Sequence, residues 1–326
     1  MNRKINIMLL FGGRSTENEI SIKSARNIYN NMDKEKYNIT LTYIDTNGNW
    51  YPIIDINDIQ SNEIITEHIK IFENIDLTFP IIHGNSGEDG SIHGFLETIG
   101  AKYIGSGILS SAICLDKSVT KAILASQNIP VVDSILFKKG VSNVYKMINK
   151  IDEILGFPVF IKPCNQGSSV GVNKSKNIKE LKEHLAIALN YDNKILIEKS
   201  IDGREVEIGI LGNDKIITSC IGEVILDDDF YTFESKYNKN TTLKIPASLE
   251  KDQEKRIKNL AVKAFQALEC KGLARIDFLI DKQNNIYINE VNTIPGFTDS
   301  SMFPKLFHKD GYSQNELIDN IIKESL

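Results

Sequence analysis

The chain has 326 residues, enough for two or three domains of ~100–200 residues each, and its 41% hydrophobic and 25% charged content is typical of a globular protein. Its 38 Lys and Arg against 43 Asp and Glu give a net charge of -5, which argues against a generally basic nucleic-acid-binding protein but not against a local phosphate site. The four cysteines lie far apart without a C-x-x-C pair, as expected of reduced thiols. No apolar stretch approaches the ~20 residues of a membrane span, so we expect a cytoplasmic protein with no membrane partner.

The first third of the chain predicts alternating strands and helices. Strands are expected over 5–11, 37–44 and 77–83, with helices after Gly12-Gly13 and over 92–99. This order predicts parallel βαβ units, whose ligands bind beyond the carboxyl ends of the strands. Polar residues in the loops 12–19 and 83–90 are therefore candidates for a site.

The rest of the chain predicts a mixture of elements with more antiparallel character. Helices are expected over 117–127, 178–189 and 249–268, and strands near 135, over 159–161 and over 195–198. The alternation over 205–210 indicates a half-buried antiparallel strand, and the strands 274–280 and 286–290 predict a hairpin. A polar loop, 227–242, separates these last elements, and we expect it to be a mobile lid.

A lysine followed by a loop rich in Gly and Ser is the strongest local signal. Lys162 ends a predicted strand, and the segment 167–171 reads Gly-Ser-Ser-Val-Gly. Backbone N–H groups and hydroxyls of such a loop can surround phosphate oxygens, while the lysine supplies charge. The same letters match G-x-S-x-G, in which Ser169 would be a hydrolase nucleophile with His308 as its late histidine, and a plain linker loop is the third reading. We favour the phosphate loop.

Paired polar residues in the predicted hairpin suggest a metal site. Arg275 and Asp277 share one strand face, as do Glu290 and Asn292. If the two faces coincide, two carboxylates and an amide meet beside one arginine, and oxygen ligands suit Mg²⁺. The alternative is an exposed edge with surface ion pairs.

A third group follows the first and third strands. Glu17, Glu19, His83, Glu88 and Asp89 are, taken singly, expected to be helix caps or surface residues. Together, at neighbouring strand ends, they could hold the ammonium or carboxylate of a small substrate.

In combination, these motifs resemble the ATP-grasp ligases and, within them, the D-alanine–D-alanine ligase family. The matching stretches run in the family's order across nearly the whole chain: 11–21, 83–90, 161–163, 167–171, 197–199, 234–237, 274–277 and 289–298. The resemblance implies an α/β fold of three domains: an N-terminal parallel doubly wound sheet (1–105), followed by two α+β domains (106–199 and 200–326) that grip ATP. His93 and Ser235 depart from the residues usual in the family.

The resemblance also implies roles for particular residues. The nucleotide would be held by Lys117, Lys162, Ser168, Ser169, Glu198, Lys199, Ile201, Glu205 and Lys236. Two Mg²⁺, with Mn²⁺ as a substitute, would bind Asp277, Glu290 and Asn292. Glu17, in a hydrogen-bonded set with Ser168 and Tyr237, would hold the amine of the first D-alanine, with His83 nearby. Arg275 and the Gly296 N–H would stabilise the tetrahedral oxyanion, and Ser301 and Met302 would hold the second carboxylate.

The implied reaction joins two D-alanines through an acyl phosphate for peptidoglycan precursor synthesis, in a homodimer. The nearest rivals are ligases of the vancomycin-resistance type, which make D-alanyl-D-serine or D-alanyl-D-lactate. The lactate-making relatives carry a histidine in place of Tyr237, and the resistance ligases tend to have an arginine in place of Met302. A non-catalytic ATP-binding module is a further alternative. The presence of the complete set argues against it: Arg275, Asp277, Glu290 and Asn292.

Overall fold

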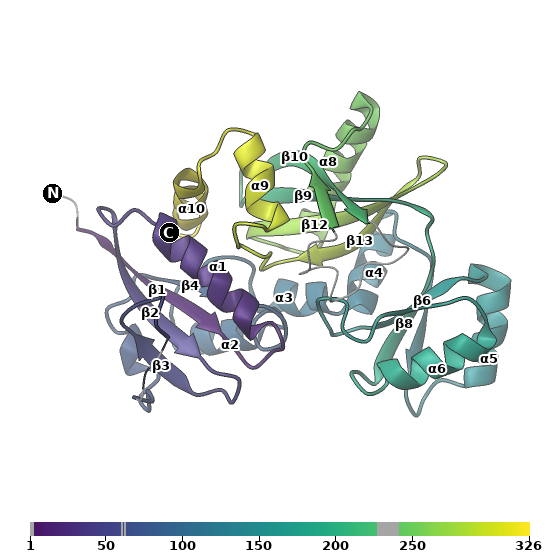
Figure 1. Cartoon of the computed structure of the whole chain (residues 1–326), viewed down its shortest axis with the longest axis horizontal. Coiled ribbons are helices and arrows are strands. Elements are labelled where there is room, and N and C mark those ends of the chain that lie inside the picture. The colour runs from purple at the N-terminus through teal and green to yellow at the C-terminus, as the bar shows by residue number, and fades with distance from the viewer. Residues whose placement is uncertain (1–2, 60, 62, 227–240) are drawn as a thin grey trace.

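Three β-sheets, each flanked by helices, make up the protein. The computed structural model describes residues 3–59, 61, 63–226 and 241–326. The sheet of the first third lies at one end of the molecule, the sheet of residues 134–199 at the other end, and a five-stranded sheet above and between them (Figure 1). One sheet falls within each range expected for a domain, although the boundaries themselves stay a prediction.

The N-terminal sheet is parallel except at one edge. Its order is β3-β2-β1-β4, with β1 parallel to β2 and β4 and antiparallel pairing only between β2 and β3. The strands are β1 Ile5–Gly12, β2 Tyr37–Ile44, β3 Trp50–Ile53 and β4 Leu77–Ile81, and the helices are α1 Asn18–Asn31, the 3₁₀ turn η1 Lys70–Phe72 and α2 Ser91–Thr98. The apolar run of β1 is buried on both faces, as a central parallel strand requires. The predicted βαβ arrangement is confirmed, while β3, a short edge strand containing Pro52, was not expected.

The middle of the chain forms an antiparallel sheet in the order β5-β8-β6-β7. Its elements are α3 Ile108–Leu115, α4 Lys117–Ser126, β5 Ser134–Lys138, α5 Val144–Lys150, the π turn η2 Ile151–Leu155, β6 Val159–Pro163, β7 Asn173–Ser175, α6 Ile178–Ala188 and β8 Lys194–Lys199. Helices α5 and α6 cover this sheet. In contrast, α3 and α4 pack beneath the five-stranded sheet, because Cys114 and Leu124 belong to its core.

The five-stranded sheet is antiparallel, in the order β11-β10-β9-β12-β13. Its elements are β9 Gly203–Gly212, β10 Ile217–Leu226, β11 Thr241–Lys244, α8 Lys251–Ala267, β12 Gly272–Asp281 and β13 Ile286–Asn292. Helix α8 covers one face through Ile257, Ala261 and Phe265. The predicted hairpin is present as β12–β13, whereas β10 was not expected, since its sequence lacks a regular alternation of apolar and polar residues.

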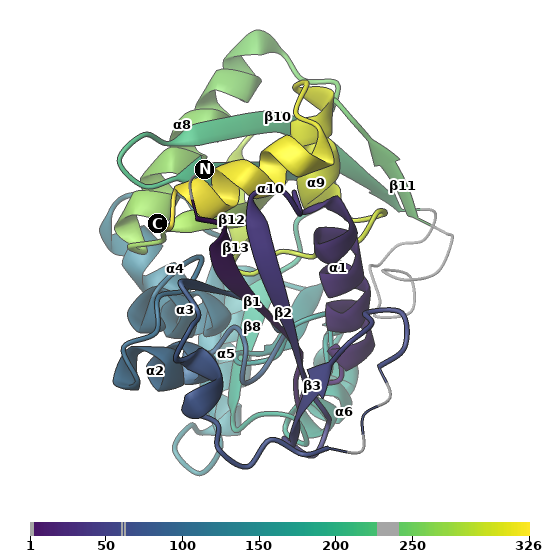
Figure 2. The same cartoon turned by 90° about the vertical axis from the view of Figure 1, so that its left-hand side faces the viewer.

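The last two helices join the C-terminal part of the chain to the N-terminal core. Helices α9 Met302–Lys309 and α10 Gln314–Lys323 lie beside α1 (Figure 2), and Phe303 and Phe307 share a core with Leu9 and Phe11 of β1. Helix α9 also packs closely on β9 and β10. A Cβ at Gly209 would lie 2.5 Å from Phe307 Cε2, so only glycine fits there.

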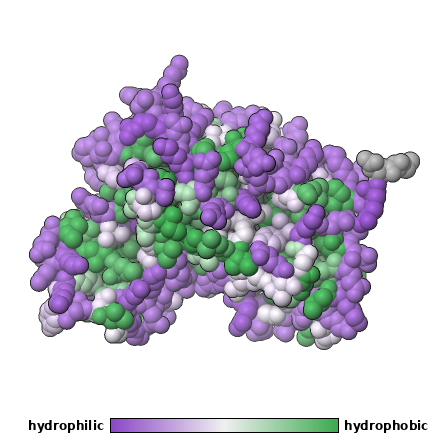
Figure 3. Space-filling view, turned by 180° about the vertical axis from the view of Figure 1, so that it is seen from behind, coloured by the Kyte–Doolittle hydropathy of each residue, from purple (hydrophilic) through white to green (hydrophobic). Residues whose placement is uncertain are grey.

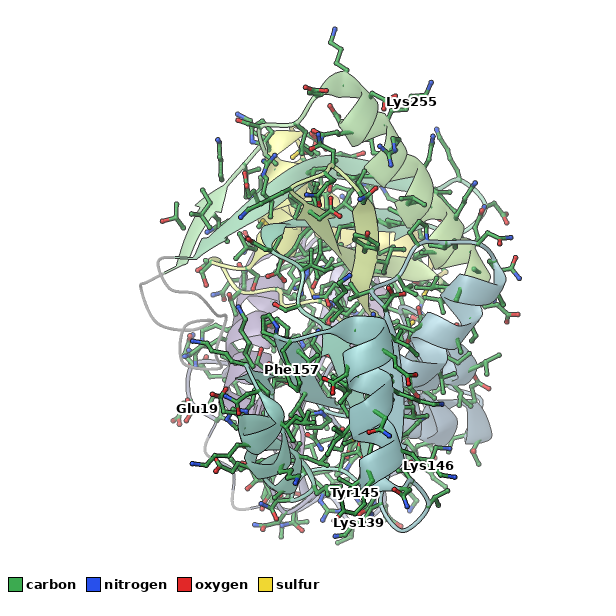
Figure 4. All side chains as sticks on the ribbon, turned by 90° about the vertical axis from the view of Figure 1, so that its right-hand side faces the viewer. Glu19, Lys139, Tyr145, Lys146, Phe157 and Lys255 are labelled. Carbon is green, nitrogen blue, oxygen red and sulfur yellow. The ribbon has the colours of Figure 1, made fainter. Side chains whose placement is uncertain are left out.

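The rear face of the molecule carries both hydrophilic and hydrophobic side chains (Figure 3). Figure 3 shows hydrophilic side chains around the rim of the rear face and hydrophobic ones between them. Figure 4 shows Lys255 on α8 at one end of the molecule and Lys139, Tyr145 and Lys146 at the opposite end. None of the described helices is both long and apolar enough to cross a membrane.

A buried carboxylate ties α10 to the N-terminal sheet. Asp319 accepts a hydrogen bond from Tyr37 Oη at 2.9 Å and pairs with Lys36 Nζ at 2.5 Å. The Asp319 side chain is 7% exposed, whereas that of Lys36 is 50% exposed. The buried Tyr37–Asp319 contact therefore contributes more to this junction than the solvent-screened ion pair.

We predict that Asp319→Ala lowers the free energy of unfolding by about 1–3 kcal/mol, because it leaves the buried Tyr37 hydroxyl without an acceptor. Urea denaturation followed by circular dichroism measures this. Lys36→Met, the control, is expected to cost clearly less; equal losses for the two variants would contradict the assignment.

Candidate functional site

Two cavities meet where the three sheets face one another. The first, of about 540 Å³, lies between the N-terminal sheet, the β12–β13 hairpin and the start of α9. The second, of about 720 Å³, lies between the central sheet and the five-stranded sheet. Among the described residues, four line both cavities: Lys117, Gly167, Ser168 and Glu290. A ligand bound across this junction would present one end to each cavity.

The structure brings nearly all the predicted site residues to these cavities. The first is lined by Glu17, His83, Lys117, Ser168, Arg275, Glu290, Asn292, Gly296, Ser301 and Met302. The second is lined by Lys117, Lys162, Ser168, Ser169, Glu198, Lys199, Ile201, Glu205 and Glu290. Asp277 lines neither, since Arg275 and Asn292 cover it. The predicted Lys236 and Tyr237, the departure at Ser235 and most of the expected lid lie outside the described residues.

Register in the β12–β13 hairpin places four polar side chains together. Asp277 pairs with Glu290 across the ladder, and Arg275 pairs with Asn292. Arg275 donates to both carboxylate oxygens of Asp277 at 2.7 Å, and the Asn292 amide nitrogen donates to Asp277 Oδ2 at 3.1 Å. The two predicted faces therefore coincide, and the alternative of an exposed edge is wrong, because Asp277 is 2% exposed.

A β-bulge makes this coincidence possible. The register shifts between Asp277 and Phe278, so that Phe278 pairs with Ile288 and Asn289 is the extra residue. Ile286 and Ile288 stay in the core, while Glu290 and Asn292 turn to the cavity face. Asn289 lines the second cavity and accepts a hydrogen bond from Lys162 Nζ at 3.2 Å.

The Gly/Ser loop closes over the junction and reaches the N-terminal sheet. Ser168 and Ser169 have φ angles of 47° and 59°, a region that non-glycine residues seldom adopt. In this conformation Ser168 Oγ donates to the Glu17 carboxylate. Lys117 Nζ donates to the Gln166 carbonyl at 2.7 Å and thereby anchors the same loop. The loop thus lies between the two cavities, and its residues Gly167 and Ser168 line both of them.

His83 holds the floor of the first cavity together. Its Nδ1 lies 3.1 Å from the Ile294 carbonyl, so this nitrogen donates, and Nε2 then accepts from Ser24 Oγ at 3.0 Å. Ser24 Oγ in turn accepts from the Phe297 N–H at 3.2 Å. His83 is buried, and its contacts set the position of the 294–297 loop that carries Gly296.

A row of buried charges lies at one wall of the second cavity. Glu198 is 2% exposed and pairs with Lys121 Nζ at 2.6 Å through one oxygen and with Lys162 Nζ through the other. Burial alone would raise the pKa of Glu198, but the two ammonium groups outweigh burial and lower that pKa to about 2. The carboxylate therefore stays ionised at neutral pH.

Two residues of this site were missed in the sequence. Lys121 follows Lys117 by four residues in α4, a spacing that places both on one helix face and that could have been noticed. Glu207 lines the first cavity and pairs with Arg275 Nε at 2.9 Å. Glu207 lies in the alternating segment 205–210, which predicted a strand. Nothing in that pattern indicated that Glu207 would face an arginine on the neighbouring strand.

The hydrolase reading of the Gly/Ser loop finds no support. His308 lies in α9, lines neither cavity and contacts Gln314 Oε1 at 2.6 Å. Ser169 follows the end of β6 by several residues instead of forming a sharp strand–helix turn.

Comparisons with known proteins cover both halves of the chain. The family model described as "D-ala D-ala ligase N-terminus" matches residues 6–106, and the one described as "D-ala D-ala ligase C-terminus" matches residues 123–323. D-alanine–D-alanine ligase of Acetivibrio thermocellus is 40% identical over 99% of this chain and 96% of that protein. The ligase of Caldicellulosiruptor bescii is 41% identical over 98% of this chain and 94% of that protein.

Solved structures resemble the whole fold. The VanG D-Ala:D-Ser ligase from Enterococcus faecalis has a TM-score of 0.90 and 31% identity, covering 99% of this chain and all of that one (100%). The D-alanine–D-alanine ligase from Coxiella burnetii has a TM-score of 0.86 and 33% identity, covering 99% of this chain and 95% of that one.

We predict a pH-dependent cost for Glu198→Gln. The pKa of Glu198 is lowered from 4.5 to about 2 on folding, so its stabilisation is fully present above about pH 4.5 and is lost as the pH falls toward 2. The variant should be destabilised on the order of 3 kcal/mol at pH 7 and by progressively less below pH 4.5 or so.

Urea denaturation of wild type and variant at pH 7, 5 and 3.5 measures that difference. Glu254→Gln, which removes an exposed partner of Lys258 on α8, is the control and should cost little at any of these pH values. A cost of Glu198→Gln that did not shrink at low pH would contradict the assignment.

Proposed function

This chain belongs to the D-alanine–D-alanine ligase family, and from that premise we propose how its own residues carry out the reaction. The protein is an ATP-dependent ligase that joins two D-alanines to D-alanyl-D-alanine for peptidoglycan synthesis. The observation that carries the assignment of roles is the junction of the two cavities at Lys117, Gly167, Ser168 and Glu290. ATP in the second cavity would present its γ-phosphate there to a carboxylate in the first.

The second cavity is proposed to hold the nucleotide. Lys117 and Lys162 lie where they can neutralise phosphate oxygens, and the loop at Ser168 and Ser169 offers hydroxyls and backbone N–H groups. The adenosine would occupy the part lined by Glu198, Lys199, Ile201 and Glu205. Phosphoryl transfer depends on alignment and charge neutralisation and needs no covalent nucleophile of the enzyme. Ser169 is therefore not required to act as a nucleophile.

The hairpin donors fit a divalent cation. No group of three or more His, Cys, Asp and Glu side chains in the described parts of the chain is arranged to hold a metal by itself. Mg²⁺, however, usually takes one or two protein carboxylates and completes its shell with water and phosphate. We propose that Asp277, Glu290 and Asn292 hold two Mg²⁺, or Mn²⁺, together with ATP, which would supply charge neutralisation at the transferred phosphate. The partner of Asp277 in the structure is Arg275, so a metal is not needed to explain its burial.

The first cavity is proposed to hold both amino acids. Glu17, fixed by Ser168 and flanked by Gly84 and Gly167, offers a carboxylate to the amine of the first D-alanine, beside His83. The second D-alanine would place its carboxylate at Ser301 and Met302, where α9 begins and the Ser301 side chain does not cap the helix. Its neutral amine then attacks the carbonyl carbon of the acyl phosphate, and Arg275 and the Gly296 N–H stabilise the tetrahedral oxyanion. The C–O bond to phosphate then breaks, so that inorganic phosphate leaves and the nitrogen loses a proton.

Further parts of the proposal rest on the family resemblance. We propose that Lys236 contacts the nucleotide, that Tyr237 joins the Glu17–Ser168 set, and that 227–242 closes over the site; of these, residues 227–240 lie outside those described. We also propose a cytoplasmic homodimer, since ATP is available there and α3 exposes Ile108 and Leu109, which a second copy would cover.

D-Serine ligation is the second candidate, favoured by the similarity to the VanG ligase. The residue Met302 favours D-alanine as the second substrate. Its side chain is 5% exposed and packs on Val224 and Leu306, and a Cβ at Gly222 would lie 2.6 Å from its sulfur. This position therefore adds apolar contact and no charge to the second subsite.

We expect Glu290→Gln to abolish ligation while leaving the fold intact, because an amide cannot offset cation charge as a carboxylate does. Phosphate release from ATP and D-alanine measures the loss, and circular dichroism checks the fold. Glu183→Gln on the exposed face of α6 serves as the matched control. Turnover like that of the wild type would rule out the metal assignment.

The product mixture tests the second subsite. With equal D-alanine, D-serine and D-lactate, we expect D-alanyl-D-alanine to dominate and the D-lactate product to be negligible. A pocket rejects one added hydroxyl by about a hundredfold at most, so some D-alanyl-D-serine is expected. Mass spectrometry separates the three products. A dominant D-serine product would overturn the argument from Met302, and a dominant D-lactate product the one from Tyr237.

A further inference from the structure

A second lysine lies behind the nucleotide wall without reaching either cavity. Lys121 is in the second turn of α4, and its side chain is 6% exposed. Its Nζ lies 2.6 Å from Glu198 Oε1 and donates to the Val132 carbonyl at 3.2 Å. It lines neither the first nor the second cavity.

Glu198 lies between Lys121 and Lys162, the lysine that lines the second cavity. Its second oxygen pairs with Lys162, whose side chain is 14% exposed and lines the second cavity. The three side chains therefore form a row in which a carboxylate lies between two ammonium groups. Lys162 Nζ also donates a hydrogen bond to Asn289 Oδ1 at 3.2 Å.

The charges of this row, together with the nearby carboxylates Glu205 and Glu290, contribute to the potential that Lys162 presents to a ligand. Glu198 with Lys162 alone would be neutral, and an anion in the cavity would meet a lysine whose charge is already compensated. With Lys121 present, the three groups sum to one positive charge. Because the row is buried, solvent screens this difference only weakly.

The capped N-terminus of α4 sets the positions of Lys117 and Lys121 relative to one another. Asp116 caps α4 by accepting from the Ser118 and Val119 N–H groups. One turn separates Lys117, at the junction of the cavities, from Lys121, behind Glu198. A single capped helix thus delivers one lysine to the ligand and the other to the carboxylate that would otherwise compensate Lys162.

We propose that Lys121 is a positioning residue for the nucleotide: its positive charge offsets that of Glu198, so that Lys162 offers a stronger positive potential to the phosphates. The inference rests on the proposed function, since it takes the second cavity as the ATP site. It adds a residue to that site that touches no substrate. Its effect is on nucleotide affinity and not on either D-alanine subsite.

A merely structural role for Lys121 makes a different prediction. In that case Lys121 only offsets the burial of Glu198, and its loss lowers stability without selective weakening of ATP binding. The test therefore compares ATP affinity with stability in the same set of variants. Lys121→Gln removes the positive charge and retains a hydrogen-bond donor, now an amide. Lys121→Arg retains the positive charge.

The control is a stability-matched change in the same helix. Leu124 lies in α4, is fully buried, packs in the core of the five-stranded sheet and carries no charge. Leu124→Ala should lower the thermal midpoint, as truncations of buried leucines do, and should leave ATP binding within about twofold of the wild type.

Calorimetry with ATP and Mg²⁺ gives the Kd, and steady-state kinetics give the KM of ATP and of D-alanine separately. We expect Lys121→Gln to raise the Kd and KM of ATP about tenfold while the KM of D-alanine changes less than about threefold. Lys121→Arg should return the Kd to within about threefold of the wild type. If the amide disturbs folding, Lys121→Met removes the same charge with a chain of similar length and no polar group to bury.

Three results would overturn the inference: an unchanged ATP Kd in Lys121→Gln, an equal rise in Leu124→Ala, or no recovery in Lys121→Arg. Lys162→Ala separates these from failure of the proposed function. If Lys162→Ala also leaves the ATP Kd unchanged, the second cavity is not the nucleotide site and the proposed function itself fails. If Lys162→Ala weakens ATP binding and Lys121→Gln does not, only the role of Lys121 is wrong.

Discussion

The register of the β12–β13 ladder is the constraint on which the site depends. It sets Asp277 opposite Glu290 and Arg275 opposite Asn292, so that two carboxylates, an amide and a guanidinium share one face. A slip of one residue would turn these side chains into the core and bring apolar residues to the cavity. The core residues Ile276, Phe278 and Ile288 prevent that slip, because their burial is lost in any other register.

The bulge at Asn289 is as important as the register. A regular strand would hold Glu290 and Asn292 on the same face as Ile286 and Ile288. The extra residue reverses the faces at that point and directs Asn289 toward Lys162 in the neighbouring cavity. One irregularity therefore serves both cavities: Asn289 faces the second cavity, and the adjacent Glu290 lies at the junction of the two.

Contacts between distant segments hold the two cavities in place relative to one another. Ser168 of the Gly/Ser loop bonds to Glu17 beyond β1, and Asn27 Nδ2 of α1 donates to the Phe297 carbonyl at 2.8 Å. Helices α9 and α10 complete the N-terminal core, so the start of α9, at the first cavity, is attached to the sheet whose first strand leads to Glu17. The first and last of the ranges expected as domains thus share a hydrophobic core, whereas the central sheet has its own. Movement of the Gly/Ser loop would change the lining of both cavities.

The parallel N-terminal sheet, the β12–β13 hairpin, the Gly/Ser loop and the candidate site residues can be predicted from the sequence, because they depend on local periodicity and on ordered motifs. Which charges meet depends on the tertiary structure. Nothing local to Lys121 indicates Glu198, and nothing near Glu207 indicates Arg275, since each pair joins segments far apart in the chain. Elements such as β10 and α9 likewise form through burial against distant partners, with Gly209 permitting the close approach of α9. Long-range packing, which pairs and desolvates these groups, is a property that no window of sequence contains.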